Sequence, residues 1–368
     1  MDISMHYYGC YALARAGGLR ADVALRVAKS SQFVDDATDT TVTVNKEGAR
    51  FRGESTSHHP SDLPANNNLD DQLMVWLPFH FLPAAQGANQ SQRLVCRKNS
   101  AVAQQMVKDH LEYAESPFAP EMIGVTAHVY ADTFAHYGFS GVSSRLNRVV
   151  GNTIKLVNGD PLTGALDAFV AKFGVQGGLL ANFRQAISSA ASGAAELMSG
   201  ALGHGAVATF PDQPYLEWSY DYEHPEMTGT ALIERQNAND YMEAAEALHT
   251  MFRKFAEAAD IYADGKGPME FADIRNALRA IVTQPVDKDA RIAAWKKALA
   301  DGKLTKAPDT ALTDYDFADW RQQTLMLGSL ADPQAASGVP VYHFHQAAAI
   351  HKYYVLRDLL PEHGVYVI

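Results

Sequence analysis

Apolar residues recur every three to four positions along most of the chain, the spacing that places them on one face of an α-helix. Gly17 and Gly18 separate the first two such stretches, and Pro117 and Pro120 precede a central one. The pattern therefore predicts a mostly helical protein. The expected helices are residues 6–16, 21–33, 100–114, 121–136, 162–173, 239–263, 269–283, 288–299 and 342–360.

The segments between these helices are expected to be short strands and loops. Residues 41–44 and 49–52 surround a turn with Asn and Gly and predict a small β-hairpin within residues 41–52. Residues 53–92 are irregular, and an irregular stretch of this length inside a domain is more often functional than idle. The Gly-, Ala- and Ser-rich residues 175–203 are typical of a thin-walled helix or a mobile flap.

Composition and charge narrow the class of protein. Hydrophobic residues make up 47% of the 368-residue chain and charged residues 20%, as in ordinary globular proteins. A net charge of −11 argues against a general nucleic-acid binder, but it is compatible with a small phosphate ester held through a metal ion. No repeat or linker divides the chain. We expect one helical domain over residues 1–368, with its metal-binding core in residues 1–265 and a helical extension in residues 266–368.

The cysteine content and the N-terminal sequence indicate the cellular compartment that we expect. Cys10 and Cys96 are too few for a disulfide framework or a Cys-rich zinc module, so we expect two buried small hydrophobes. Residues 1–20 lack the basic and then apolar pattern of a secretory signal, and no run of ~18 apolar residues predicts a membrane span. The expected location is the cytoplasm, with signal-independent export left open.

The strongest chemical motif is GVTAHVYADTFAHYGFSG at residues 124–141. His128, Asp132 and His136 lie four residues apart, and each four-residue step turns a helix by only ~40°, so the three side chains share one face. The outer two lie roughly 12 Å apart at their Cα atoms, too far for one small ion. A carboxylate midway between them can bridge two ions, as two-metal hydrolases require.

Other histidines and acids lie within reach along the sequence. Imidazole and carboxylate without thiolate form the ligand set of catalytic zinc, iron or manganese. Adjacent acids suit a site in which one ligates and the other orients a ligand or takes a proton. The candidates are His6, Asp35, Asp36, His58, His59, His204 and Asp212. By contrast, His80 in PFHFLP is flanked by apolar residues and is expected to fill the core or a pocket wall, and His343, His345 and His351 are expected to be structural.

The segments HYYGCYALARAGGL, VAKSSQFVDDA and GVTAHVYADTFAHYGF resemble the bacterial zinc-dependent phospholipases C that hydrolyse phosphatidylcholine, whose fold relatives are the three-zinc single-strand nucleases. The resemblance covers roughly residues 1–260 and is most specific at residues 6–36 and 124–141. It implies a multi-helix bundle around two or three zinc ions. The implied ligands are His6, Asp36 or its neighbour Asp35, His58 or His59, His128, Asp132 as the bridging carboxylate, and His136.

The chain also departs from that family. Well-known members use the residue at the free N-terminus as a ligand, whereas five residues precede His6 here. Three residues rather than five separate Asp132 from His136. In place of a downstream His-x3-Glu pair the chain offers His204 and Asp212, which we assign from their chemistry alone.

The function that follows from the resemblance is phosphodiester hydrolysis by a metal-activated water, with Asp35, Asp36 and Asp132 as the catalytic acids and phospholipid as substrate. Tyr7, Tyr8 and Tyr137 are expected to line a headgroup pocket. Peripheral contact with a membrane follows from a lipid substrate, and no nucleic-acid partner is expected. Two alternatives stay open: a soluble metal-dependent phosphodiesterase or nuclease, and a non-catalytic helical binding protein stabilised by metal.

Overall fold

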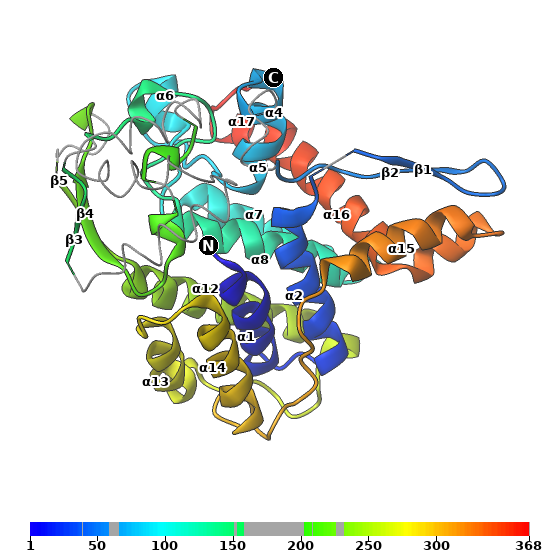
Figure 1. Cartoon of the computed structure of the whole chain (residues 1–368). Coiled ribbons are helices and arrows are strands. Elements are labelled where there is room, and N and C mark those ends of the chain that lie inside the picture. Colours follow the sequence, from blue (N-terminus) through cyan, green and yellow to red (C-terminus); the bar gives the residue numbers. More distant parts are fainter. Residues whose placement is uncertain are drawn as a thin grey trace, which may run out of the picture.

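The computed structural model describes residues 1–38, 40–58, 66–150, 153–157, 202–207, 209–225 and 232–367. The expected helix 162–173, nearly all of the expected flap 175–203, and His59 lie outside the described residues. The described part is mostly helical with small antiparallel sheets, which confirms the predicted fold class (Figure 1). Among the described helices, none is both long and apolar enough to cross a bilayer.

A central helix organises the fold. This helix, α8 (Ala119–Ala135), is buried at every position and lies in the middle of the molecule (Figure 1). A helix that is largely apolar all round can be buried on all sides. The long helices that contact it include α2 (Ala21–Asp36), α7 (Ala101–Leu111), α12 (Asn237–Ala258) and α16 (Pro340–Tyr354).

The N-terminal segment forms two consecutive helical pieces before α2. The first is a π-helical turn, η1 (Ser4–Gly9), which continues into α1 (Cys10–Ala16). π-Helical turns are rare and often occur at functional sites. Gly18 has φ +96°, a conformation that favours glycine, and lets the chain turn from α1 into α2.

Most of the predicted elements are present, with boundaries shifted by a few residues. The predicted hairpin is confirmed as β1 (Val42–Val44) paired antiparallel with β2 (Arg50–Arg52). The irregular region contains the short helices α4 (Leu69–Asp71), η2 (Gln72–Trp76), α5 (Leu77–Phe79) and α6 (Gln90–Arg93).

A three-stranded sheet, which the sequence patterns did not predict, covers one end of α8. Its antiparallel order is β3 (Lys155–Leu156), β4 (Glu217–Asp221) and β5 (Leu232–Gln236). Trp218 and Tyr220 on β4 point inward and stack with 4.9 Å between ring centroids. The single turns beside this sheet are η3 (Arg145–Asn147), η5 (Gly205–Val207) and η6 (Phe210–Asp212).

The residues after 265 share the same hydrophobic core as the N-terminal helices. Ile274, Leu278 and Trp295 belong to the cluster that contains Met5 and Tyr11. Further along the chain, Phe33 of α2 stacks on Trp320 and meets Phe344 edge-on. The elements are η8 (Asp260–Tyr262), α13 (Phe271–Val282), α14 (Lys288–Ala300), α15 (Phe317–Ser329), η9 (Pro333–Gly338), η10 (Val355–Leu359) and α17 (Leu360–Glu362).

Candidate metal centre

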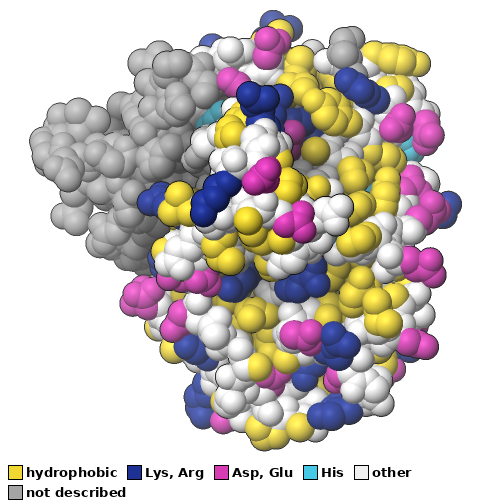
Figure 2. Space-filling model, turned by 90° about the vertical axis from the view of Figure 1, so that its right-hand side faces the viewer, with side chains coloured by type: hydrophobic (Ala, Val, Ile, Leu, Met, Phe, Trp, Pro, Cys, Tyr) yellow, Lys and Arg dark blue, Asp and Glu magenta, His cyan; other side chains and the backbone are white. Residues whose placement is uncertain are grey.

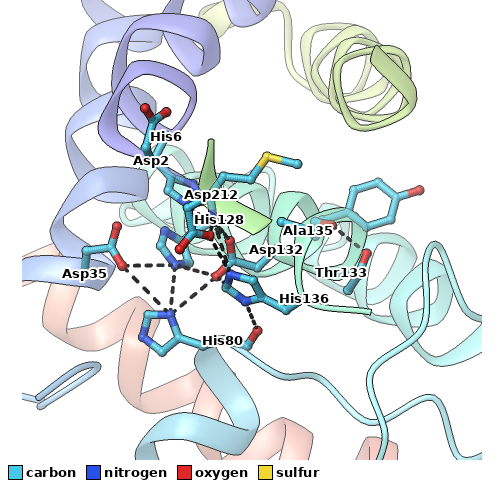
Figure 3. A network of polar contacts seen from close by, with 12 residues as sticks. Asp2, His6, Asp35, His80, His128, Asp132, Thr133, Ala135, His136 and Asp212 are labelled. Carbon is cyan, nitrogen blue, oxygen red and sulfur yellow. Dashed lines mark hydrogen bonds and ion pairs between the residues drawn. The ribbon is translucent and has the colours of Figure 1, made fainter. Parts of the chain in front are cut away.

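Histidine and aspartate side chains from five separate stretches of the chain converge on the polar face of α8 (Figure 3). Within each of three groups, the candidate ligand atoms all lie within 4.8 Å of one another. The first two groups share His128, and His136 Nδ1 of the third lies 3.4 Å from Asp132 Oδ2, so together they form one continuous site. They are His6, Asp35 and His128; His80, His128 and Asp132; and His136, His204 and Asp212.

Backbone carbonyl groups fix the orientation of three of the imidazoles. The Nδ1–H of His128 donates to the carbonyl oxygen of Ser31 at 2.8 Å, and the Nε2–H of His80 donates to that of Thr56 at 2.9 Å. The Nδ1–H of His136 donates to the carbonyl oxygen of His80 at 2.9 Å. A carbonyl only accepts, so the second nitrogen of each ring carries a lone pair when the ring is neutral. Metal-binding histidines are typically held in this way.

Three of the resulting acceptor atoms form a nearly equilateral triangle. His80 Nδ1 lies 3.3 Å from His128 Nε2, and Asp132 Oδ2 lies 3.4 Å from the first and 3.3 Å from the second. If no proton lies between these three atoms, their lone pairs repel one another, and a cation in the middle would remove the repulsion. Ligands at ~2.0–2.1 Å from a tetrahedral zinc ion lie roughly 3.3 Å apart. The triangle therefore has the dimensions of one face of a zinc site.

His6 completes the other side of this cluster. Its ring stacks on that of His128 with 3.9 Å between centroids, and its Nε2 lies 3.1 Å from Asp132 Oδ1. Neither nitrogen of this fully buried ring has a hydrogen-bond partner, and neither does Asp132 Oδ2. Burial, together with the neighbouring His128, lowers the pKa of His6 to about 3, so the ring is neutral. Buried polar atoms without partners are costly, and a metal ion would satisfy them.

The third group lies at the opposite end of Asp132. His136 Nε2 is 3.0 Å from Asp212 Oδ1, and His204 Nε2 is 3.6 Å from Asp212 Oδ2. The amino nitrogen of Met1 lies 2.5 Å from Asp132 Oδ1, 3.2 Å from Asp212 Oδ1 and 3.5 Å from His136 Nε2. The five residues before His6 thus fold the first residue of the sequence back into the site.

Asp132 offers its two oxygens to different groups. Oδ2 faces the triangle with His80 and His128, whereas Oδ1 faces His6 and the Met1 nitrogen. A carboxylate in this position has the geometry required to bridge two cations.

The buried negative charges of the site favour the binding of cations. Burial raises the pKa of Asp132, but His136 and the Met1 ammonium lower it to well below the usual value. For Asp212, burial again raises the pKa, and the Met1 ammonium and His204 more than offset it. Burial lowers the pKa of the Met1 amino group, and the surrounding carboxylates bring it to about 10. One ammonium thus faces several buried carboxylates, and buried charge without full compensation is expensive.

Asp35 lies where the site meets the surface. Its side chain is 34% exposed, whereas the side chains of His80 and His128 are at most 4% exposed. Its Oδ1 is 3.9 Å from both His80 Nδ1 and His128 Nε2. Burial raises the pKa of Asp35, and the surrounding histidines lower it to below the usual value. Asp35 therefore marks the opening of the site.

Comparison with known proteins gives a family but no activity. Residues 1–359 match a family described as a family of unknown function, DUF6765. The chain belongs to this family. No curated protein and no solved structure matches it.

The histidine that joins the site from the irregular region is His80 and not His58. His58 Nε2 instead lies 3.3 Å from Asp71 Oδ1, and His58 belongs to none of the three groups. His80 is buried, as the sequence predicts for a residue of the core or a pocket wall, and its Nδ1 also faces Asp132. Its one visible signal was a polar ring at the end of a short apolar helix, α5.

Asp36 lies beside the site but in none of the three groups among the described residues. Gln32 Nε2 donates to its Oδ2 at 3.2 Å. Burial and the neighbouring carboxylate of Asp35 raise the pKa of Asp36 to about 6. Of the two adjacent acids, Asp35 is therefore the candidate ligand.

The three tyrosines expected to line a headgroup pocket have contacts outside the three groups. Tyr7 and Tyr8 are core residues whose hydroxyls donate to the carbonyl oxygen of Thr313 and to Asp314. Tyr137 lies under the guanidinium of Arg235, with 3.7 Å between the guanidinium carbon and the ring centroid. Aromatic residues next to ligands in sequence point away from them, because neighbouring positions on a helix face different directions.

Proposed function

We propose that this protein is a zinc-dependent phospholipase C, which cleaves the phosphodiester of glycerophospholipids such as phosphatidylcholine to diacylglycerol and a phosphorylated headgroup. The triangle of His80, His128 and Asp132 carries the metal part of this proposal, because its edges fit a zinc ion and the buried Asp132 Oδ2 has no hydrogen-bond partner. The resemblance of residues 6–36 and 124–141 to zinc phospholipases supports the reaction and the substrate.

The ligand assignment follows the three groups. His80, His128 and Asp132 would hold one ion, with His6 and Asp35 beside them, and His136, His204 and Asp212 would hold another, with the Met1 nitrogen beside it. When bound, zinc supplies Lewis-acid activation of water and neutralises charge on the phosphate oxygens. The chain needs no basic cradle for the phosphate, which agrees with a site built from carboxylates and histidines.

The residues around the candidate ligands have separate roles in the proposed reaction. The backbone carbonyls of Ser31, Thr56 and His80 hold the imidazoles in one orientation. In the reaction, the oxygen of water bonds to phosphorus and the bond from phosphorus to the glycerol oxygen breaks. We assign Asp36, adjacent to Asp35 and outside the groups, to accept the proton of the attacking water. The departing glycerol oxygen takes a proton from bulk water, and Asp36 returns its proton to the solvent.

Metal analysis and two assays test this proposal. The purified chain is expected to bind two or three zinc ions and to hydrolyse both phosphatidylcholine and a chromogenic phosphodiester. Fewer than one bound ion per chain would overturn it. Activity on single-stranded nucleic acid without activity on lipid would favour a nuclease instead.

The variant Asp132→Ala separates catalysis from structure. A folded variant that retains part of its metal but loses hydrolysis supports catalysis at this site. If the wild type binds metal without hydrolysing either substrate, and the variant unfolds, the ions serve only stability. Circular dichroism and metal content are therefore measured alongside both rates.

A further inference from the structure

The hairpin β1–β2 projects from the body of the molecule and has one face without a protein partner among the described residues (Figure 1). Side chains alternate between the two faces of a strand, and Thr43 and Phe51 form one cross-strand pair that is only partly exposed. On the other face Val42 is 49% and Val44 51% exposed. These exposed valines pair with two arginines, Val42 with Arg52 and Val44 with Arg50.

This exposed face is cationic in an acidic protein. Residues 41–53 contain Lys46, Arg50 and Arg52 against a single acid, Glu47, whereas the whole chain has a net charge of −11. All three cations are exposed, and none forms an ion pair within the described part of the chain. The hairpin is therefore a local concentration of unpaired positive charge.

Helix α15 adjoins the opposite face of the hairpin. A Cβ on Gly328 would lie 3.1 Å from Thr43 Cγ2, and the side chain of Thr43 points away from the face of Val42 and Val44. Figure 2, which views this side of the molecule, shows hydrophobic side chains interspersed with Lys, Arg, Asp and Glu.

Both strands of the hairpin connect directly to the metal centre. Helix α2 ends at Asp36, next to Asp35 at the opening of the site, and β1 begins six residues later. After β2 the chain reaches Thr56, whose carbonyl orients His80. A surface that rests on this hairpin therefore lies at the side of the molecule on which Asp35 is exposed.

We propose that the exposed hairpin face, formed by Val42, Val44, Arg50 and Arg52, docks on an anionic phospholipid bilayer. A small apolar area flanked by unpaired cations fits such a surface, because apolar side chains enter the headgroup region while Lys and Arg meet the lipid phosphates. The two exposed valines favour a bilayer over nucleic acid, whose phosphate backbone offers no apolar region. This inference rests on the proposed phospholipid substrate, since it supplies the contact that such a substrate requires.

Vesicle sedimentation tests the face without depending on catalysis. The probes are vesicles of pure phosphatidylcholine and vesicles of phosphatidylcholine and phosphatidylserine in equal amounts, at low and high salt. The wild-type protein is expected to bind the mixed vesicles, to bind the neutral ones weakly, and to be released by salt. Each cation near the surface contributes about fivefold in partition, so Arg50→Gln/Arg52→Gln should lower binding about 25-fold.

The matched control is Arg275→Gln/Arg279→Gln, which removes the same charge from α13. Control and test positions are all exposed, so both variants should fold as the wild type does, which circular dichroism verifies. Equal binding of the two variants, or no binding by the wild type, would overturn the proposal. The proposal would also be overturned if the protein formed a dimer in solution and Val42→Ser/Val44→Ser abolished that dimer, because a second copy of the chain would then cover the face.

The same experiment separates this inference from the proposed function. Binding to anionic vesicles that depends on Arg50 and Arg52, without any hydrolysis, would leave the docking face valid and the phospholipase proposal refuted. Hydrolysis of a soluble phosphodiester without binding to vesicles would support the proposed hydrolase activity and refute the docking face.

Discussion

The substitution Gly124→Ala offers a sharp test of how the helices hold the metal centre. Gly124 lies on α8 where that helix crosses α2, one turn before His128. A Cβ at this position would be 2.5 Å from the carbonyl oxygen of Val27 and 2.6 Å from Ser30 Cβ. Ordinary contacts begin at 3.4 Å, so the two helices must separate locally by about 0.9 Å.

The cost of this separation can be worked out from the contacts across the crossing. Overpacking a well-packed core typically costs about 1–3 kcal/mol. The bond from His128 Nδ1–H to the Ser31 carbonyl, 2.8 Å long, would stretch beyond hydrogen-bonding range and forfeit about 1 kcal/mol. Alanine regains about 1 kcal/mol of helix propensity over glycine. The net expected loss of unfolding free energy is about 1–3 kcal/mol, so packing outweighs propensity.

Two measurements check this prediction. Urea unfolding gives the loss of stability, and zinc content after dialysis should fall, because a tilted His128 no longer faces His80 and Asp132. The matched control is Gly338→Ala, since a Cβ there meets nothing within 4 Å. A Gly124→Ala protein as stable and as rich in zinc as the control would refute the reasoning.

Three further predictions concern individual residues. His80→Ala is expected to lower zinc content and hydrolysis at least tenfold, while His58→Ala leaves both unchanged; equal effects would contradict the assignment of His80. Burial lowers the pKa of His351 in the folded protein to about 4, below the ~6.5 of an unfolded histidine. The stabilisation that the neutral ring provides is therefore complete above about pH 6.5, and the free energy of unfolding falls by about 3 kcal/mol as the pH drops toward 4. In His351→Gln this part of the pH profile of urea unfolding should flatten, and an unchanged slope would count against it. A Gly-Ser pair placed ahead of Met1 should displace the amino group from Asp132 and lower both the zinc content and the melting temperature. The same pair added at the C-terminal end should alter neither quantity. Identical melting curves for the two variants would rule out this role of Met1.

The sequence predicts the helical frame well because its strongest signals are local. The spacing of His128, Asp132 and His136 places them on one buried face of α8 and at its end, as the structure has them. Turn chemistry at Asn45 and Gly48 likewise identifies the hairpin, where Asn45 accepts backbone hydrogen bonds from within the turn.

The rest of the site depends on contacts between distant segments, which periodicity does not record. His80 follows α5 in apolar surroundings, and only the packing of α5 against α8 turns its ring toward Asp132. Helix α15 was missed because its apolar residues do not gather on one face, although its capping residue Asp316 accepts a bond from Ala318 N–H. Strand β4 lies within residues 205–222, whose Pro and aromatic content is also typical of a loop.

Residue 80 links two parts of the metal centre through different atoms. Its side-chain Nδ1 belongs to the triangle with His128 and Asp132, and its backbone carbonyl orients His136 in the third group. A cation that draws the ring of His80 into place also fixes the carbonyl that orients His136. Filling of the two positions should therefore be cooperative, with a zinc titration steeper than two independent sites would give.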